Sequence, residues 1–484
     1  MSKYIIAIDQ GTTSSRAILF DEDTRVLDCK NREFNQYFPK DGWVEHNPEE
    51  IWSSVCFVVE SIINENNLRA EDIASIGIAN QRETTVVWDK NSGKPIYNAI
   101  VWQDRRTSKI CGNYNGSQED IHLKTGLIID PYFSATKVKW ILENVEGAKR
   151  RAKNGDLLFG TIDSFLIWRL TEGKMHKTDA TNASRTMLFN ICEGSWDNDL
   201  LTLFDIPSCI LPSVENSSTN FGNTNLFNGK IRIGGVAGDQ QAALIGQACF
   251  EKGDIKSTYG TGCFVLINTG KDLVMSKNKL LSTIAYKLDN KITYGLEGSI
   301  FVAGSAIQWL RDEMKFFAQA KDSEAFVKKS KDNNNIYVIP AFTGLGAPYW
   351  DPEARGAIFG ITRDTSREDI TKATIESVAF LTKDLFEAMA TDNASLKNLK
   401  VDGGMVSNTW FCQTLANELG SDVFRPSNVE TTSLGVAYLA GLEAGLFSSL
   451  EDLKNNEDGQ TFSPKVSNGK YEEWKKKLYK VLEN

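Results

Sequence analysis

The sequence predicts an α/β fold built from two large domains with a ligand-binding cleft between them. At 484 residues, the chain is longer than a single hydrophobic core usually organises. Both halves alternate short apolar runs, typical of strands, with segments whose apolar residues recur at helical spacing. In each half, an apolar strand also leads directly into a turn of small residues, at Asp9–Arg16 and at Gly260–Gly262.

The first half begins with a series of predicted strands that flank one long helix. The strands are expected at Tyr4–Ile8, Ala17–Phe20, Ile73–Ile78 and Thr85–Trp88. From Pro48 to Asn64 the apolar residues recur at helical spacing, which predicts an amphipathic helix. Further along, Ile233–Gly238 predicts a buried strand that ends at Asp239, and a helix is expected to begin with Gln240.

The second half repeats this arrangement. A strand at Asp254–Tyr259 leads into the turn Gly260-Thr261-Gly262, and a short strand is expected at Ile336–Pro340. Ser366 followed by Asp369 is typical of a helix N-terminus and predicts the start of a long amphipathic helix.

A third turn of small residues follows the predicted strand Leu399–Val401. It reads Asp402-Gly403-Gly404, and Asn408 is placed to cap the next helix. No low-complexity linker separates the halves, and the boundary is expected between Gly246 and Gly253. The predicted domains are therefore 1–246 and 247–484, hinged so that the cleft closes on a ligand.

Composition excludes several classes of function. A net charge of −9 argues against nucleic acid or an anionic membrane as partner. The best membrane candidate, Ile51–Ile63, is too short and contains Glu60, so no membrane insertion is expected. Neither the eight cysteines nor the three histidines show metal-ligand spacing. Since Met1-Ser2-Lys3 leads straight into the first strand, no targeting signal is expected, and we expect a cytoplasmic protein.

The first small-residue turn reads Asp9-Gln10-Gly11-Thr12-Thr13-Ser14-Ser15-Arg16. Gly11 allows a sharp turn, and the Thr and Ser residues leave room for a bulky anion to approach the backbone. Their N–H and O–H groups can donate to phosphate oxygens, and Asp9 is placed to hold hydrated Mg²⁺. An ordinary polar hairpin with an exposed Asp is the alternative interpretation of this segment alone.

The three turns together resemble the nucleotide site of the actin-like ATPase superfamily. The turns Asp9–Arg16, Thr258–Gly262 and Asp402–Gly404 follow the order of its phosphate-1, phosphate-2 and adenosine elements. The resemblance implies two ribonuclease H-like domains with ATP between them. The implied cofactors are ATP and Mg²⁺, with Asp9 holding the metal mainly through water.

Within that superfamily, the chain resembles the glycerol kinases of the FGGY carbohydrate kinase family from Tyr4 to about Gly445. The matching segments include DQGTTSSRA (9–17), NQRETTVVW (80–88), GKPIYNAIVWQDRR (93–106), TNASRTMLFN (181–190), AGDQQAAL (237–244), YGTGCF (259–264) and FTGLGAPYWDP (342–352). The resemblance implies transfer of the ATP γ-phosphoryl group to a terminal hydroxyl of glycerol, which gives sn-glycerol 3-phosphate and opens glycerol catabolism.

The resemblance also implies a set of site residues. The polyol site falls on Arg82, Glu83, Trp102, Tyr132, Asp239, Gln240 and Phe264. Polar residues of these types suit the three hydroxyls, and the aromatic rings suit a thin hydrocarbon backbone. The nucleotide contacts fall on Thr12, Thr13, Ser14, Arg16, Thr261, Gly304, Gln308, Gly404 and Asn408. Asp239 is expected to act as general base, and Arg16 to stabilise the phosphoryl group.

Each assignment has a plainer structural interpretation. Arg82-Glu83 could be a surface ion pair, Trp102 and Phe264 core residues, and Asp239 a helix cap. At the level of function, the alternatives are a kinase of the same family acting on a pentulose or related polyol, a nucleotide-dependent assembly or chaperone module, and an inactive sensor.

Regulation is where the resemblance is weakest. Some bacterial relatives are inhibited by fructose 1,6-bisphosphate through a Gly-rich basic loop, but Leu226–Arg232 is shorter and poorer in Gly here, so we do not expect this inhibition. No histidine follows His176, so activation by histidine phosphorylation in that region is not expected either. The resemblance implies a homodimer or homotetramer. The tail beyond Gly445 is predicted to contain a surface helix.

Overall fold

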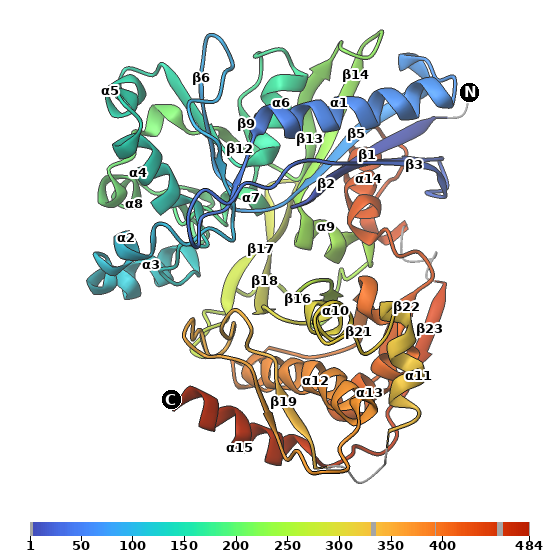
Figure 1. Ribbon diagram of the computed structural model, residues 1–484. Helices are drawn as coiled ribbons and strands as arrows, with labels where there is room; N and C mark the ends of the chain where they lie inside the picture. The colour runs from blue at the N-terminus through green and yellow to red at the C-terminus, as the bar shows by residue number, and fades with distance from the viewer. Residues whose placement is uncertain (1–2, 331–334, 393, 453–457, 484) are drawn as a thin grey trace.

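Two mixed β-sheets, one from each half of the chain, organise the fold (Figure 1). The computed structural model describes residues 3–330, 335–392, 394–452 and 458–483. In Figure 1 the first sheet and its helices lie above the second, and β16, β17 and β18 lie close to the junction.

The first sheet has six strands in the order β13-β14-β5-β1-β2-β3. Their bounds are β1 Tyr4–Gln10, β2 Ser14–Phe20, β3 Val26–Glu33, β5 Ile73–Asn80, β13 Ser218–Thr224 and β14 Ile231–Gly238. β1 pairs antiparallel with β2 and parallel with β5, and β14 runs parallel to β5. The carboxyl ends of β1, β5 and β14 therefore meet at one edge, where Asp9 lies near the end of β1 and Arg82 and Asp239 follow β5 and β14.

The strand β1 is apolar from Tyr4 to Ile8 because both faces of its sheet are covered. Ile6 and Ile8 pack in a core with helices α1 (Pro48–Glu65) and α6 (Ile162–Leu170). Ile5 and Ala7 pack on the opposite face with α9 (Asp239–Gly246) and α14 (Thr431–Glu443). A parallel pair buried on both faces requires such a continuous apolar run.

A smaller lobe lies beside the first sheet and carries its own core. Its helices are α2 Ser108–Gly112, α3 Gln118–Thr125, α4 Ser134–Asn144, α5 Ala148–Lys153 and α8 Asn198–Phe204. The short helix α7 Ala180–Ala183 packs in a separate small core with Phe189 and Ile191. Short strand pairs complete the first half: β4 Glu45–His46 with β7 Ala99–Ile100, β6 Val86–Asp89 with β8 Leu157–Gly160, β9 Lys177–Asp179 with β12 Ser213–Glu215, and β10 Phe189–Asn190 with β11 Ser195–Trp196.

The second sheet has seven strands in the order β17-β18-β16-β15-β21-β22-β23. Their bounds are β15 Ile255–Tyr259, β16 Cys263–Gly270, β17 Leu281–Leu288, β18 Lys291–Ile300, β21 Leu399–Asp402, β22 Val423–Pro426 and β23 Gly459–Phe462. The accompanying elements are α10 Gly304–Asp312, α11 Ser323–Val327, α12 Arg367–Thr391, α13 Thr409–Leu419, α15 Tyr471–Leu482, and the strand pair β19 Tyr337–Ile339 with β20 Ala357–Phe359.

Helix α14 belongs to the second half of the chain but packs on the first sheet. It also packs closely against α9, because a glycine of each helix lies directly against the backbone of the other helix. A Cβ on Gly435 would overlap the carbonyl of Ala242, and a Cβ on Gly246 would overlap the carbonyl of Thr431. The chain thus crosses back to its first sheet, and the two halves share a packed connection.

The predicted elements are present, with small shifts at their ends. Ser366 and Asp369 form a reciprocal capping box at the start of α12. Asp239 is the first residue of α9, while Gly238 occupies the N-cap position, so its interpretation as a helix cap is wrong. The tail helix exists as α15, although its inner face is buried through Tyr471, Trp474 and Leu478.

Candidate functional site

The hairpin between β1 and β2 forms the first predicted phosphate loop. Asp9 and Arg16 lie opposite each other across the two strands, and the N–H of Gly11 donates to the carbonyl of Ser14 at 2.9 Å. Thr13 is exposed at the tip. The guanidinium of Arg16 contacts the carboxylate of Glu430, which directly precedes α14, at 2.9 Å.

The Asp9 carboxyl lies at the centre of this region. Burial raises its pKa to about 6, Arg16 opposes that shift, and the nearby Asp239 and Glu430 carboxylates add to it. Within the described ranges, no three His, Cys, Asp or Glu side chains gather as a ready-made metal site. A single carboxylate suits a cation that keeps most of its water, as Mg²⁺ does, so the residues present fit the predicted metal.

The second small-residue turn joins β15 to β16 and meets the start of α10. The N–H of Gly304 donates to the carbonyl of Gly260 at 2.9 Å, and the N–H of Ala303 donates to that of Thr261 at 2.9 Å. A Cβ on Gly262 would lie 2.6 Å from the carbonyl oxygen of Ile300, so only glycine fits there. Thr261, Gly304 and the exposed Gln308, all predicted nucleotide contacts, are thereby gathered on adjoining backbone.

The third turn follows β21. Gly403 has a φ of +92° and packs against the backbone of Tyr259, whereas a Cβ on Gly404 would meet nothing within 4 Å. The close approach fixes the turn beside β15, and Gly404 leaves open space above it. Asn408 caps α13, as predicted: its Oδ1 accepts from the N–H of Phe411 at 3.1 Å.

Arg82 and Glu83 follow β5 and are buried, so their interpretation as a surface ion pair is wrong. The Nε of Arg82 lies 3.2 Å from an Asp239 oxygen and 3.9 Å from Glu83 Oε1. Glu83 has a φ of +61°, a conformation that non-glycine residues rarely adopt and that needs support from its surroundings. The hydroxyl of Ser134 supplies part of that support by donating to the Glu83 carbonyl at 3.0 Å.

Two further charged residues complete this cluster. Glu297 on β18 accepts from Arg82 Nη1 at 2.5 Å and Nη2 at 3.2 Å, and from Arg185 Nη2 at 2.9 Å. Arg185 also donates from Nε to Glu83 Oε1 at 2.6 Å. Burial raises the pKa of Glu83, and Arg185 opposes that rise. We call Arg82, Glu83, Arg185, Asp239 and Glu297 the charged cluster.

Three aromatic side chains lie side by side near the charged cluster. The ring centroids of Trp102 and Tyr132 are 5.7 Å apart, and those of Trp102 and Phe264 are 6.1 Å apart, both edge to face. The Trp102 Nε1 donates to Thr12 Oγ1 at 3.0 Å, which links this group to the first phosphate loop. Tyr132 lies over the Arg185 guanidinium, 5.6 Å from ring centroid to Cζ.

Four charged residues at the site were missed by sequence reasoning: Arg185, Lys256, Glu297 and Glu430. Lys256 is fully buried on β15, and its ammonium donates to Gln240 Oε1. Arg185 lies inside segment 181–190, which resembles the glycerol kinases, and this resemblance was the signal by which Arg185 could have been found. The others are isolated charges in the second half, and only the fold brings them to the first.

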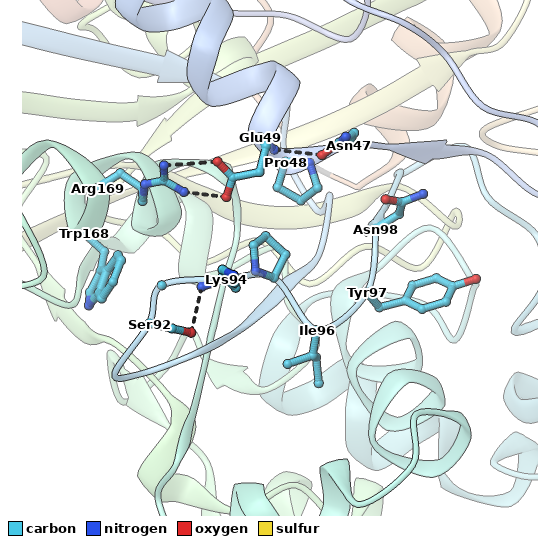
Figure 2. A pocket seen from close by; sticks show the side chains of 12 residues that line it. Asn47, Pro48, Glu49, Ser92, Lys94, Ile96, Tyr97, Asn98, Trp168 and Arg169 are labelled. Atoms are coloured by element: carbon cyan, nitrogen blue, oxygen red, sulfur yellow. Dashed lines mark hydrogen bonds and ion pairs between the residues drawn. The ribbon is translucent and has the colours of Figure 1, made fainter.

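A pocket of about 630 Å³ lies elsewhere, between the start of α1, the 92–98 loop and α6 (Figure 2). Its charged groups Glu49 and Arg169 pair with each other at 2.6 and 3.1 Å, as the dashed lines show. None of the predicted site residues lines it. This pocket is therefore separate from the charged cluster and the phosphate loops.

No helix in the described part of the chain combines the length and apolar character needed to span a bilayer.

Comparison with known proteins assigns the chain to a family. Residues 4–246 match the N-terminal domain model of the FGGY carbohydrate kinases, and 255–444 match the C-terminal one. A glycerol kinase of Ectopseudomonas mendocina is 57% identical over 473 residues, which cover 96% of each chain.

Two solved structures illustrate the range of similar folds. The glycerol kinase of Plasmodium falciparum with ADP superposes with a TM-score of 0.92 at 36% identity, covering 99% of this chain and 98% of that one. A ligand-bound xylulose kinase of Lactobacillus acidophilus has a TM-score of 0.88 at 21% identity, covering 99% and 97%, and shows the fold alone. The chain therefore belongs to the FGGY family of carbohydrate kinases.

Proposed function

We propose that this protein is a glycerol kinase that transfers the γ-phosphoryl group of ATP to a terminal hydroxyl of glycerol, giving sn-glycerol 3-phosphate. The observation that carries the proposal is the buried charged cluster, which adjoins three aromatic rings and the first phosphate loop. Similarity to curated glycerol kinases over nearly the full chain supports it.

The acceptor would lie between polar and aromatic groups. Arg82 and Gln240 would donate to its hydroxyl oxygens, Glu83 and Asp239 would accept from its hydroxyl hydrogens, and the Tyr132 hydroxyl could do either. Trp102 and Phe264 would cover the hydrocarbon backbone. Because Gln240 Oε1 already accepts from Lys256, its amide N–H groups are the ones left for a ligand.

The nucleotide would lie across the three small-residue turns. Thr12, Thr13 and Ser14 would donate to the terminal phosphates from one side and Thr261 from the other, while Gly304, Gln308, Gly404 and Asn408 would contact the nucleoside. The open space around Gly404 supports the assignment of Gly404 to the nucleoside. Since Asn408 Oδ1 caps α13, a nucleotide contact by Asn408 would come from its amide N–H₂.

In the proposed mechanism, Asp239 accepts the proton of the attacking hydroxyl. Phosphoryl transfer has a loose transition state in which the hydroxyl proton leaves late, so a weak but well-placed base suffices. Arg16 would stabilise the charge on the moving group, for which it must leave Glu430 or share its guanidinium with it. Mg²⁺, held by Asp9 through water, would offset charge on the phosphate oxygens.

The two domains, 1–246 and 247–484, would close on the bound substrates and exclude water, which otherwise competes as acceptor. We further propose that the protein acts in the cytoplasm, where glycerol and ATP meet, and assembles as a homodimer or homotetramer, for which sedimentation of the purified protein is the direct test.

ADP formation tests the function. Purified protein with Mg-ATP would be assayed with glycerol, xylulose, ribulose, gluconate or no acceptor. Strong stimulation by glycerol alone supports the proposal. Preference for a pentulose or gluconate would keep the phosphoryl chemistry but overturn the acceptor, and turnover indifferent to every acceptor would favour an assembly or chaperone module.

A further inference from the structure

Glu297 is a fully buried carboxylate that reaches the predicted acceptor site from the other half of the chain. It lies on β18 of the second sheet, whereas its partners Arg82 and Arg185 belong to the first half. Arg82 uses both terminal nitrogens on Glu297, while its Nε lies 3.2 Å from an Asp239 oxygen. The orientation of the Arg82 guanidinium plane therefore depends on Glu297, which was not among the predicted site residues.

Glu297 also acts on Glu83 through Arg185. The same Oε1 atom of Glu297 that accepts from Arg82 Nη2 accepts from Arg185 Nη2 at 2.9 Å, and Arg185 Nε then binds Glu83 at 2.6 Å. Arg82 and Glu83 are thus both held, directly or through one arginine, by a single carboxylate.

Stability alone does not account for this arrangement. Bringing charges out of water costs several kcal/mol for each ion, and well-packed apolar residues of similar size are often at least as stable as a buried ion pair. Here two guanidiniums and two carboxylates are buried together, and the Nη1 of Arg185 has no hydrogen-bond partner among the residues that the structure describes. Such a costly group beside Asp239 is better explained by the orientation that it gives to ligand-binding atoms.

We propose that Glu297 is a positioning residue for the acceptor: it holds Arg82 toward Asp239 and, through Arg185, holds Glu83, so that the acceptor site is formed only when the second half of the chain contributes its carboxylate. This inference rests on the proposed function, because it takes the charged cluster to be the acceptor site. It assigns Glu297 no contact with the nucleotide.

The test is a kinetic comparison of Glu297→Gln and Glu297→Asp with the wild type, using whichever acceptor the wild type phosphorylates. Glu297→Gln is expected to raise the acceptor KM by about tenfold or more and to leave the ATP KM within about twofold. Glu297→Asp keeps the negative charge but has a shorter side chain, so its acceptor KM should lie between those of the wild type and Glu297→Gln. If Glu297→Gln does not fold, Glu297→Asp still provides the comparison.

Glu376→Gln is the matched control. Glu376 is also a buried carboxylate of the second half, 2% exposed, and lies on α12, where it pairs with Lys470. This variant is expected to lower the thermal unfolding temperature without changing either KM.

The outcomes separate the two proposals. An unchanged acceptor KM in both Glu297 variants, or equal rises for acceptor and ATP, would reduce Glu297 to a structural role and overturn the inference. A wild type that prefers another acceptor would overturn the proposed function and leave the Glu297 result readable. A wild type that no acceptor stimulates would overturn both.

Discussion

At the scale of single residues, Asp239 combines the two properties that a general base needs here. Its side chain is 30% exposed, so a substrate can reach it, and the guanidinium of Arg82 lies beside it, with Nε 3.2 Å from Oδ1. We predict that Asp239→Asn, which keeps the shape and removes the base, lowers kcat by roughly 10²–10⁴-fold. Steady-state assays with glycerol and Mg-ATP measure this, and a loss smaller than about tenfold would remove Asp239 from the role.

Glu83 is expected to act on acceptor binding and not on the nucleotide. Its carboxylate accepts a hydrogen bond from Arg185, and no contact among the described residues links the Glu83 carboxylate to the phosphate loops. We predict that Glu83→Gln raises the KM for glycerol while the KM for ATP stays within about twofold. The substitution weakens acceptor binding equally in the ground state and the transition state and leaves the nucleotide contacts unchanged. An equal rise in both constants would show that the assigned acceptor and nucleotide residues are wrong.

The sequence predicted candidate site residues at strand ends and missed those that depend on distant contacts. Asp9 was predicted near the end of β1, and Arg82 and Asp239 were predicted after β5 and β14. Glu297 could not be found this way, since it is 215 residues from Arg82 and its own neighbours on β18 form an ordinary strand. Only the meeting of the two sheets reveals it.

At the scale of helices and strands, the crossing of α9 and α14 is the tightest contact between elements of the two halves. We predict that Gly435→Ala destabilises the protein by about 1–3 kcal/mol, because the added methyl group would overlap the Ala242 carbonyl and force the helices apart. Chemical denaturation measures the change. Gly112→Ala in α2 is the control, since a Cβ there meets nothing within 4 Å. Equal stability of both variants would contradict the tight crossing.

Helix α6 begins with a buried carboxyl that should make stability depend on pH. Burial raises the pKa of Asp163 from 3.8 to about 7, although the hydroxyls of Thr161 and Thr178 donate to it at 2.5 and 2.6 Å. The folded state therefore binds the proton more tightly than the unfolded state, so this group's contribution to the free energy of unfolding falls as pH rises through that interval.

Asp163→Asn removes this titration, since the amide stays neutral. We predict that its thermal unfolding temperature rises relative to the wild type as pH increases between about 4 and about 7, and that the difference levels off above that interval. Differential scanning calorimetry across this range is the measurement. A difference that does not vary with pH would show that Asp163 has the same protonation behaviour in both states.

Strands were predicted where they form apolar runs, namely β1, β2, β5 and β14 in the first sheet and β15 and β21 in the second. The remaining strands of the two sheets, β3, β13, β16, β17, β18, β22 and β23, were not predicted. The two-residue strands β4, β7, β10 and β11 carry no such signal, since their pairing is set by tertiary contacts. The packing of α14 on the first sheet was not predicted, because this contact joins residues far apart in the sequence.

At the scale of the whole molecule, the predicted acceptor site is shared between the halves. The first contributes Arg82, Glu83 and Asp239, and the second contributes Glu297 to the arginines and Lys256 to Gln240. Family membership and similarity to glycerol kinases imply the chemistry, whereas the cross-sheet contacts explain how one cluster is assembled. A domain movement would therefore change the acceptor site and the phosphate loops together.

The most direct test of this account is a crystal structure of the protein with glycerol and a non-hydrolysable ATP analogue. We predict glycerol hydroxyls within hydrogen-bond distance of Arg82, Glu83 and Asp239, with the carbon backbone against Trp102 and Phe264 and one terminal hydroxyl facing the γ-phosphate. Glycerol bound elsewhere, or a terminal hydroxyl that faces away from both Asp239 and the γ-phosphate, would contradict the account.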